Sequence, residues 1–294
     1  MSAPVDKSPG LVKKVLRISR QDPFALSGLC IYLLFALTAL FADLIALHEP
    51  MEILFLSDGK VAVNQGPSRE FWLGTTNLGR DIFSQLVYGA RSAIMVGVSA
   101  ALMVVIVGTL VGLFSGYFGG WVDTVLMRTG DIALSIPFLP FIIVLAAFLK
   151  PNIWNVVIGV SLLLWPNTGR IVRSQVLSLR ERSYVEAAKV SGASHLSILF
   201  AHIAPNVLPI SFLYGSIVIG WAIFTEASVS FLGFGPTDSV SWGFMLQDAF
   251  VSQALSRGAY YWFVPSGLCI MLMVSAGFFI SRGYEELLFP KLRG

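Results

Sequence analysis

The side chains in this sequence that could do chemistry are few and scattered. His48, His195 and His202 have no acidic or cysteine partner at metal-ligand spacing, so no metal site is predicted. The pair Gly59-Lys60 lacks both the upstream glycine and the following Ser or Thr of a phosphate-binding loop. The sequence therefore predicts no catalytic residue, no bound cofactor and no ATP hydrolysis by this chain alone.

Acidic residues within or beside apolar stretches are the next candidates for chemistry. Asp43 and Glu226 lie near the predicted outer ends of two apolar segments, and Asp131 lies near an inner end. A charge at the centre of a bilayer costs about 2.5 to 3.5 kcal/mol on insertion scales, whereas water reaches the ends of a span. We therefore predict helix-end hydrogen bonds for these carboxylates, rather than a proton relay or a substrate site.

The elements that carry these residues are predicted to be membrane spans. The 294 residues are 55% hydrophobic and only 13% charged, and the mean hydropathy is +0.76, whereas soluble domains carry about 25% charged residues. A helix needs about 20 mostly apolar residues to cross a bilayer. Six segments qualify, with predicted ranges 23–47, 93–114, 132–149, 153–165, 208–225 and 262–280.

Basic residues predict the orientation of these spans. Lys and Arg are concentrated before the first span, between residues 170 and 189, and at the end of the chain. By the positive-inside rule both termini are expected in the cytoplasm, in agreement with an even number of spans. The first apolar run has about 25 residues, against the 7 to 15 of a cleavable signal peptide, so we predict a retained helix.

The segment between the fourth and fifth spans, about 171–206, is too charged to cross a membrane and too periodic to be a loose loop. Residues 184–190 predict a short helix that ends near Gly192, because glycine readily adopts the left-handed backbone that closes a helix. Ser194 is the predicted N-cap of a second, amphipathic helix. Its expected apolar face consists of Leu196, Leu199, Phe200 and Ile203.

The spacing of five residues in this segment resembles the EAA loop of bacterial ABC-importer permeases. The residues are Glu186, Ala187, Ala188, Gly192 and Pro205. In that family the loop supplies a coupling helix that docks into a cleft on a separate ATPase subunit. Small alanine side chains permit the close approach of another surface, and Glu186 can pair with a basic group there. The alternative interpretation is an amphipathic helix that rests on lipid headgroups.

Further segments make the resemblance specific to permeases of the peptide and nickel type. They are 73–81 and 88–91 before the second span, 116–123 after it, 230–235 and 241–246 after the fifth, and the tail 289–293. The long outer loops resemble the family's contact surface for a substrate-loaded binding protein. Three positions depart from the family pattern: His202 replaces an aliphatic residue, Ala204 a leucine and Arg282 an acidic residue.

The resemblance implies an all-α polytopic membrane protein with six transmembrane helices and the type I ABC-importer permease fold. The expected parts are a cytoplasmic tail (1–22), a first helix (23–48), an outer loop (49–90), a permease core (91–282) and a cytoplasmic tail (283–294). The implied partners are a second homologous permease in a heterodimer, two ABC ATPase subunits that bind the ATP, a substrate-binding protein and membrane lipid, with no nucleic acid. The implied location is a bacterial or archaeal cytoplasmic membrane.

The implied substrate is a dipeptide or oligopeptide, and nickel, opines or sugars remain alternatives. A secondary transporter would instead show inverted repeats and coupling-ion ligands near the midplane, and neither is visible in the sequence. An intramembrane enzyme would need a convergent catalytic set, whereas the acids here are scattered.

Two features predict how the spans pack and bend. Gly108, Gly112 and Gly116 form a row of small residues at one-turn spacing on the second span, which lets another helix approach closely. That helix could belong to this chain or to a partner subunit. Pro137 and Pro140 are expected to bend or break the third span near its start.

Overall fold

The computed structural model describes residues 22–149, 152–236 and 239–288, with side chains to residue 283. The basic N-terminal tail (1–21) and the tail 289–293 that entered the resemblance lie outside the described residues. In the described part, β-structure is limited to two isolated bridges, Phe55 with Val61 and Thr75 with Asp81. The helices are α2 (Pro23–Leu40), α3 (Ala42–Ile45), α4 (Ile82–Phe118), α5 (Gly120–Ser135), α6 (Phe138–Phe148), α7 (Ile153–Leu179), α8 (Ser183–Val190), α9 (His195–Ser197), the π-helix η1 (Ile198–Ile203), α10 (Ala204–Phe231), α11 (Trp242–Val251) and α12 (Tyr260–Leu288).

Four of the described helices are long and apolar enough to cross a membrane. They are α2, α4, the continuous helix from His195 to Phe231, and the Tyr260–Gly283 part of α12. A fifth span results if α5 and α6 are counted together, although they are bent by 81°. Length and composition thus support at most five of the six predicted spans among the described residues. The class of a multi-pass helical membrane protein is established.

The bend between α5 and α6 lies where proline was expected to cause one. Pro137 is the N-cap of α6, and Ile136 before it has the extended backbone that a following proline favours. The predicted break is confirmed. The predicted span begins too late, however, because α5 already starts at Gly120, and the break therefore lies within the α5–α6 pair rather than at its beginning.

The predicted fourth span is α7, which continues through Pro166 for 27 residues. Its C-terminal half carries Asn167, Arg170 and Arg173, and these polar residues dilute its apolar character. Among the described helices, α7 makes its largest contact with α4. Helix α7 is therefore held by packing along α4 as well as by its apolar N-terminal half.

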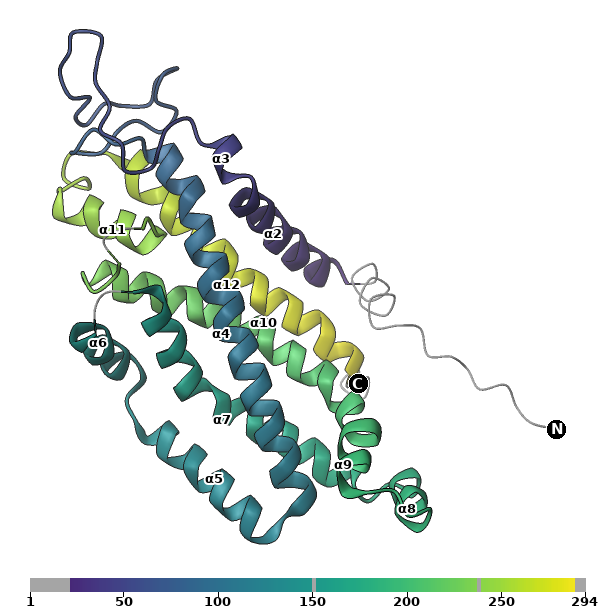
Figure 1. The fold of residues 1–294 in the computed structure, drawn as a ribbon. Helices are drawn as coiled ribbons and strands as arrows, with labels where there is room; N and C mark the ends of the chain where they lie inside the picture. Colours follow the sequence, from purple (N-terminus) through teal and green to yellow (C-terminus); the bar gives the residue numbers. More distant parts are fainter. Residues whose placement is uncertain (1–21, 150–151, 237–238, 289–294) are drawn as a thin grey trace.

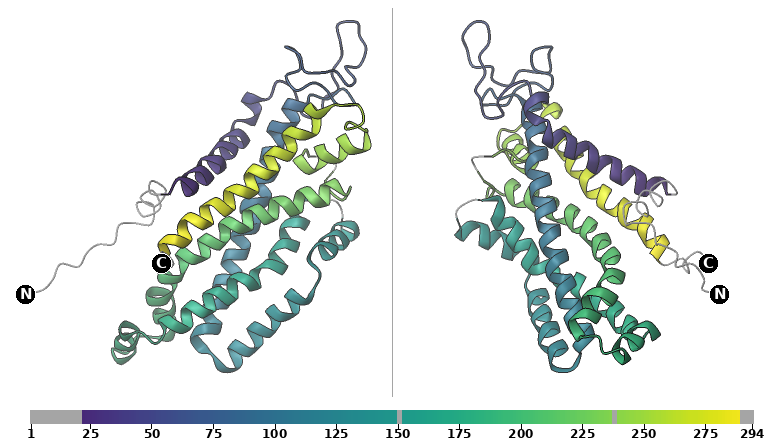
Figure 2. Two further views of the ribbon diagram at one scale, coloured as in Figure 1. Left: turned by 180° about the vertical axis from the view of Figure 1, so that it is seen from behind. Right: turned by 45° about the vertical axis from the view of Figure 1, so that its right-hand side comes forward.

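The helices form an elongated bundle with irregular structure at one end and short helices at the other (Figure 1). Helix α4 runs through its length, α10 and α12 lie side by side, and α2 packs along α12, while α5 and α7 lie on the opposite side of α4 (Figure 2). Residues 46–81 form the cap at the first end, which we call the cap end. Helices α8 and α9 lie at the other, which we call the turn end.

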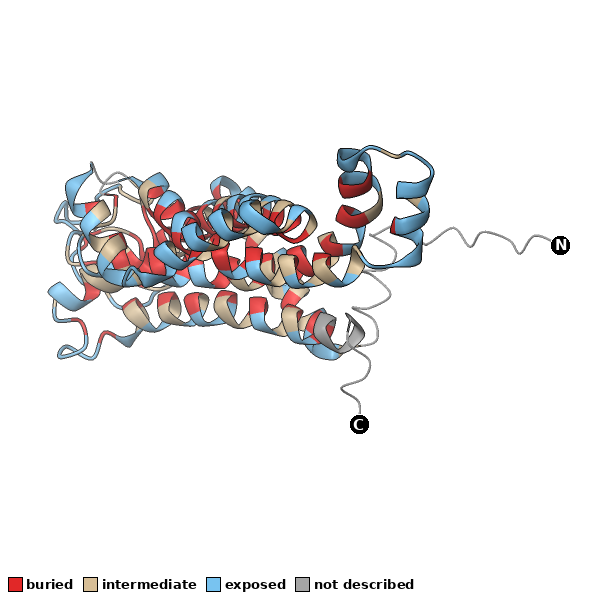
Figure 3. Cartoon of the chain, turned by 90° about the horizontal axis from the view of Figure 1, so that it is seen from below, coloured by how far each residue is buried: buried red, intermediate tan, exposed pale blue. Residues whose placement is uncertain are grey.

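Buried residues lie mostly along the seams between helices, and exposed residues lie on the outward faces (Figure 3). Many of the exposed side chains are large and apolar, such as Leu33, Leu44, Ile132, Phe148 and Met271. Apolar residues on the outside of a bundle are expected where lipid, rather than water, is the solvent. The burial pattern therefore agrees with the composition.

The glycine row on α4 lies against α7. A Cβ atom built on Gly108 would stand 2.7 Å from Cβ of Thr168, and one on Gly112 would stand 2.6 Å from the carbonyl oxygen of Gly169. At Gly116 the nearest atom would be Cβ of Val176, at 2.8 Å. All three distances are shorter than real Cβ contacts, so the two backbones approach closely within one chain. This geometry favours the intramolecular alternative for the row.

We predict that Gly112→Ala lowers the thermal stability of the purified protein, whereas Gly267→Ala does not. Both changes gain about 0.5–1 kcal/mol of helix propensity. At Gly112 the new methyl group would meet backbone and a β-branched side chain, and such overpacking costs about 1–3 kcal/mol. At Gly267 nothing lies within 4 Å of a Cβ atom. Thermal unfolding in mild detergent measures the difference, and equal midpoints for the two variants would contradict it.

Candidate functional site

Helix α8 and the turn after it form the exposed tip of the turn end. Gly192 has φ +80° and its N–H donates to the carbonyl of Lys189 at 3.0 Å, while the Ala193 N–H donates to the carbonyl of Ala188 at 3.0 Å. These two bonds make a Schellman motif, which needs a left-handed residue after the helix. Ala188 and Ala193 also both pack against a cluster of buried apolar side chains from α4, α7, α8, η1 and α10. The predicted helix end at Gly192 is confirmed.

The segment then forms a second helix in two stages. Ser194 is the N-cap of α9, and its Oγ accepts a hydrogen bond from the Ser197 N–H at 3.3 Å, as predicted. After three α-helical residues the chain continues as the six-residue π-helix η1, whose end is marked by a bond from the Ala204 N–H to the Leu199 carbonyl. The π-helix leads without a break into α10. We call residues 183–206 the turn segment.

The apolar face predicted for this helix is wrong at two of its four positions. Leu199 and Ile203 are fully buried, but Leu196 is 56% exposed and Phe200 is 47% exposed. Ile198, which the α-helical pattern had left out, is buried instead. The prediction assumed α-helical geometry, whereas the wider turn of a π-helix rotates the preceding residues to another face.

The five residues of the EAA-like pattern occupy different surroundings. Glu186 and Ala187 are exposed on the outer face of α8, and Ala188 is half-buried against the cluster beneath. Gly192 is exposed, with open space around it. Pro205 is also exposed but lies beyond the π-helix, in the first turn of α10. The fold thus brings Glu186, Ala187 and Gly192 together at the tip and leaves Pro205 apart from them.

A cluster of buried side chains holds α8 on the bundle. Val185 of α8 is fully buried with Val172 and Val176 of α7 and with Leu199 of η1. The turn segment is also tied to the end of α4, because the Tyr117 hydroxyl and Nδ1 of His195 are 2.9 Å apart. Helix α8 therefore packs on the same cluster as α7, α4 and α10.

Ion pairs fasten the neighbouring ends of α4, α5 and α7. Arg173 of α7 makes two hydrogen bonds of 2.5 Å to the carboxylate of Asp123 on α5, which also accepts from Ser115 of α4. Arg180 donates to the Gly116 carbonyl at 3.1 Å, and Arg170 pairs with Asp131 at 2.6 Å. The hydrogen bond predicted for Asp131 is present, but its predicted place at the start of a span is wrong, because α5 begins eleven residues earlier at Gly120. The ion pair between Asp123 and Arg173 was not predicted. Both residues flank predicted spans on the same side, so the pair could have been predicted from the sequence.

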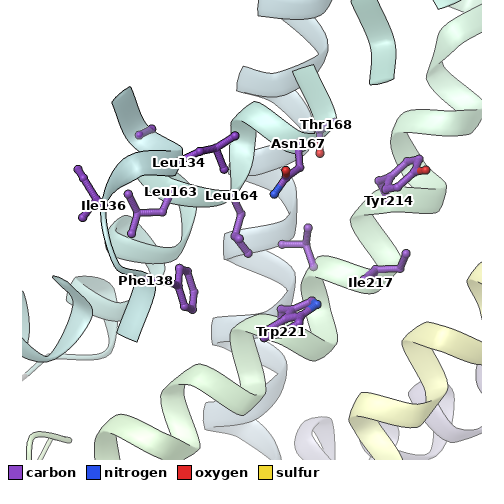
Figure 4. A pocket seen from close by; sticks show the side chains of 12 residues that line it. Leu134, Ile136, Phe138, Leu163, Leu164, Asn167, Thr168, Tyr214, Ile217 and Trp221 are labelled. Atoms are coloured by element: carbon purple, nitrogen blue, oxygen red, sulfur yellow. The ribbon is translucent and has the colours of Figure 1, made fainter. Parts of the chain in front are cut away.

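A cavity of about 370 Å³ opens between the α5–α6 break, α7 and α10. Leu164 and Asn167 of α7 face Tyr214 and Trp221 of α10 across it, and Phe138 lies beside the break (Figure 4). The lining is mostly apolar with a few polar groups, which is the usual character of a ligand site. None of these lining residues was predicted as a site residue from the sequence. A polar Asn167 next to Pro166 in a membrane helix was the available signal.

At the cap end, carboxylates anchor the connections between helices. Asp43 of α3 accepts two hydrogen bonds from Arg91, at 2.9 and 2.7 Å, and one from the Tyr88 hydroxyl at 2.8 Å. The Arg91 guanidinium, followed by Tyr88, holds the pKa of Asp43 below its ordinary value. Glu226 is buried and accepts from the Ser230 hydroxyl at 2.6 Å. The hydrogen bonds predicted for Asp43 and Glu226 are thus present, but Glu226 is only 2% exposed, so the expectation that water reaches its side chain is wrong.

Beneath the cap lies a set of polar side chains with little access to water. Asp81 is fully buried and caps α4, because its Oδ2 accepts from the Ser84 N–H at 2.9 Å. Burial raises the pKa of Asp248 on α11, and the positive charge of Arg80 partly opposes that shift. Among the described residues no group of three His, Cys, Asp or Glu side chains is arranged to hold a metal ion. Asp238, in the second outer loop, lies outside the described residues.

Comparisons with known proteins show that this chain is similar to transport proteins. Residues 108–294 match the family model described as "Binding-protein-dependent transport system inner membrane component". The chain is 35% identical over 290 residues to the oligopeptide transport system permease protein OppC of Bacillus subtilis, which covers 98% of this chain and 92% of the relative. It is 36% identical to the dipeptide transport system permease protein DppC of Alkalihalophilus pseudofirmus, in an alignment that covers 93% of this chain and 88% of the relative. It is 34% identical to the glutathione transport system permease protein GsiD of Pectobacterium atrosepticum, in an alignment that covers 94% of this chain and 90% of the relative.

We predict that Gly192→Ala loosens the turn after α8. A side chain at φ +80° costs about 1–2 kcal/mol, so the population in which the turn is open rises by about five- to thirtyfold. Amide hydrogen exchange of a peptide that contains Ala193 measures this, because its N–H bonds the Ala188 carbonyl. Gly66→Ala is the control, since Gly66 also has open space around it but has no left-handed backbone. Unchanged exchange in Gly192→Ala would contradict the prediction.

Proposed function

Because the chain belongs to the family of binding-protein-dependent transport system inner membrane components, as an ABC-importer permease of the peptide type, we propose that it forms half of the membrane path through which an ATP-driven importer passes dipeptides or oligopeptides. The peptide substrate is inferred from the names of its relatives, which transport oligopeptides, dipeptides and glutathione. Nickel, opines and sugars remain alternative substrates of the same architecture.

The observation that carries this proposal is the exposed tip of α8 at the end of the bundle opposite the cap. Glu186 and Ala187 lie on its outer face, where a small side chain permits close contact and a carboxylate can meet a basic group of another protein. The tip is fixed to α7, α4 and η1 beneath it. We propose that Glu186, Ala187, Ala188, Gly192 and Pro205 together make the segment that couples the permease to a separate ATPase.

The proposal also assigns a direction to the chain in the membrane. The turn end carries Arg128, Arg170, Arg173, Arg180 and Arg182, and we place it in the cytoplasm by the positive-inside rule. The cap and α11 then face the substrate-binding protein on the other side. With α7 counted as a span beside α4, the chain crosses the membrane six times and both termini are cytoplasmic.

We propose that the cavity between the α5–α6 break, α7 and α10 belongs to the substrate path. It is lined by residues of α5, α6, α7 and α10 and by none of α2 or α12, and the lining includes the polar Asn167. Polar positions inside a membrane protein usually face a water-filled path or another polypeptide. A second homologous permease on this side would close the path, which gives the heterodimer with two ATPases that the resemblance implies.

A secondary transporter is the competing function for a polytopic chain. It would work without ATP and would leave the exposed tip of α8 without a role. Rigid-body rocking driven by two ATPases uses that tip, because packed helices switch between discrete arrangements when one end is moved.

We predict that the tagged chain, purified from its native membrane in mild detergent, brings with it an ATPase and a second permease, and that Glu186→Lys reduces the amount of ATPase recovered. Reversing the charge places an ammonium group where the partner is expected to be basic. Reversing a charge at a docking surface costs several kcal/mol, so we expect a loss of about tenfold or more. Quantitative mass spectrometry of the purified complex measures the ratio of ATPase to permease.

Glu70→Lys is the control for this experiment, because it makes the same charge change in the cap. It should leave the ATPase ratio unchanged. If Glu70→Lys released the ATPase and Glu186→Lys did not, the assigned direction would be wrong. A chain that purifies alone and transports without ATP would establish the secondary transporter instead.

We also predict that a cysteine at Asn167 reacts with a charged, water-soluble thiol reagent at least about tenfold faster than one at Met271, after Cys30 and Cys269 are replaced by serine. A thiol must ionise to react, and ionisation requires water. Asn167 lines the proposed path, whereas Met271 is 55% exposed on the outer face of α12, where lipid is expected. Equal rates for Asn167→Cys and Met271→Cys would exclude a water-filled path at this cavity.

A further inference from the structure

The π-helix η1 has a local cause in the sequence that follows it. Pro205 has no N–H, so it cannot donate the α-helical hydrogen bond to the carbonyl of Ala201, and its ring would crowd that carbonyl. A wider turn with i to i+5 bonds, such as the bond from Ala204 N–H to the Leu199 carbonyl, avoids the clash. The Asn206 side chain donates to the His202 carbonyl at 2.7 Å and so satisfies a second carbonyl of the widened turn.

The π-helix decides which side chains of the turn segment face the bundle. Val207 of α10 is fully buried, and Leu196 and Phe200 precede it by eleven and seven residues. In an unbroken α-helix with 3.6 residues per turn these spacings are close to three and two whole turns. Leu196 and Phe200 would then share the buried face of Val207. In the structure they are exposed and Ile198 is buried instead, while Leu199, which also belongs to the predicted α-helical face, is buried as well.

The turn segment therefore carries apolar side chains for two alternative helix registers. Leu196 and Phe200 would face the bundle in an unbroken α-helix, and Ile198 faces it in the observed helix with its π-helical turn. One extra residue in the turn rotates everything before it by about 100° relative to α10. That rotation includes α9, the turn at Gly192 and α8, which carries Glu186 and Ala187. The direction in which the tip of α8 points thus depends on the π-helix.

We propose that Pro205 is a positioning residue, which holds the π register of residues 198–203 and thereby sets the face that α8 presents to the ATPase. This inference rests on the proposed function of the turn segment, and it gives Pro205 a role different from docking. Pro205 is exposed but lies beyond the π-helix rather than at the tip, in agreement with an action through the helix register.

The test compares Pro205→Ala with the same substitution combined with deletion of Ala201, an exposed residue of the π-helix. Pro205→Ala restores the missing N–H and permits an unbroken α-helix, which turns α8 away from its native direction. Deleting Ala201 removes the surplus residue, so the double variant regains the native direction with α-helical bonds throughout. Pro209→Ala is the matched control, because it replaces the next proline of α10, four residues further on, where the helix is already α-helical.

The first measurement is the ratio of ATPase to permease in the complex purified from native membranes. We expect a loss of about tenfold in Pro205→Ala, within the usual range of coupling between sites, recovery in the double variant and no change in Pro209→Ala. If Pro205→Ala keeps its ATPase, or if the double variant fails to recover it, Pro205 does not act through the register and the proposal is overturned.

The second measurement is thiol labelling of Leu196→Cys in the purified full-length chain, with Cys30 and Cys269 replaced by serine. The cysteine should label readily with Pro205 present, about tenfold more slowly with Pro205→Ala because burial protects it, and readily again after the deletion. Unchanged labelling in Pro205→Ala would overturn the register change itself. This measurement needs no ATPase, so it still decides the register if the wild-type chain recovers no ATPase and the proposed function fails.

Discussion

The close approach of α4 and α7 is the contact on which the rest of the structure depends. Lipid gives two helices no hydrophobic reason to associate, so tight van der Waals packing must hold them, and the three glycines of α4 supply the room for it. The seam runs from Gly108 towards the turn end, where α7 continues to Leu179 and delivers the chain to α8. The same helix carries Asn167 on another face, towards the cavity. One seam therefore places the tip of α8 and one wall of the proposed path.

Charged groups reinforce this frame near its ends and, through Arg170 and Asp131, between α7 and α5 along its length. Arg173, Asp123 and Ser115 join three helices at the turn end, and Arg91 with Asp43 joins α3 to α4 near the cap. At these depths water and headgroups reduce the cost of desolvating an ion, so the pairs can hold helix ends without burying unpaired charge. Between the ends, small residues and a few hydrogen bonds, such as that from the Tyr32 hydroxyl to the Ser216 carbonyl, add to the contact between helices.

Proline acts differently at each point of the bundle, and the difference follows from what the neighbouring backbone can do. Pro166, Pro209 and Pro265 lie inside helices that continue past them, where packing against neighbouring helices holds the chain in place. Pro137 begins α6 after an extended residue, and the chain turns by 81°. Pro205 widens the turn before it without breaking the helix. The residue type alone does not determine whether a helix continues, breaks or widens.

The sequence by itself determined the membrane class, the approximate positions of the spans and the local ends of the turn segment. These depend on runs of apolar residues, on an N-cap serine and on a glycine that adopts a left-handed backbone, all of which act within a few residues. It also carried the family resemblance through the spacing of Glu186, Ala187, Ala188, Gly192 and Pro205.

Only the tertiary structure decided which helix fills the glycine groove, that α5 begins at Gly120, where the cavity lies, and that Leu196 and Phe200 face outward. Each of these depends on contacts between residues far apart in the chain or on a helix register that proline changes. A search for a periodicity of 3.6 residues does not predict a π-helix. The wider turn is stabilised by the packing of Ile198 and Leu199 on α7 and α10, which is a tertiary contact.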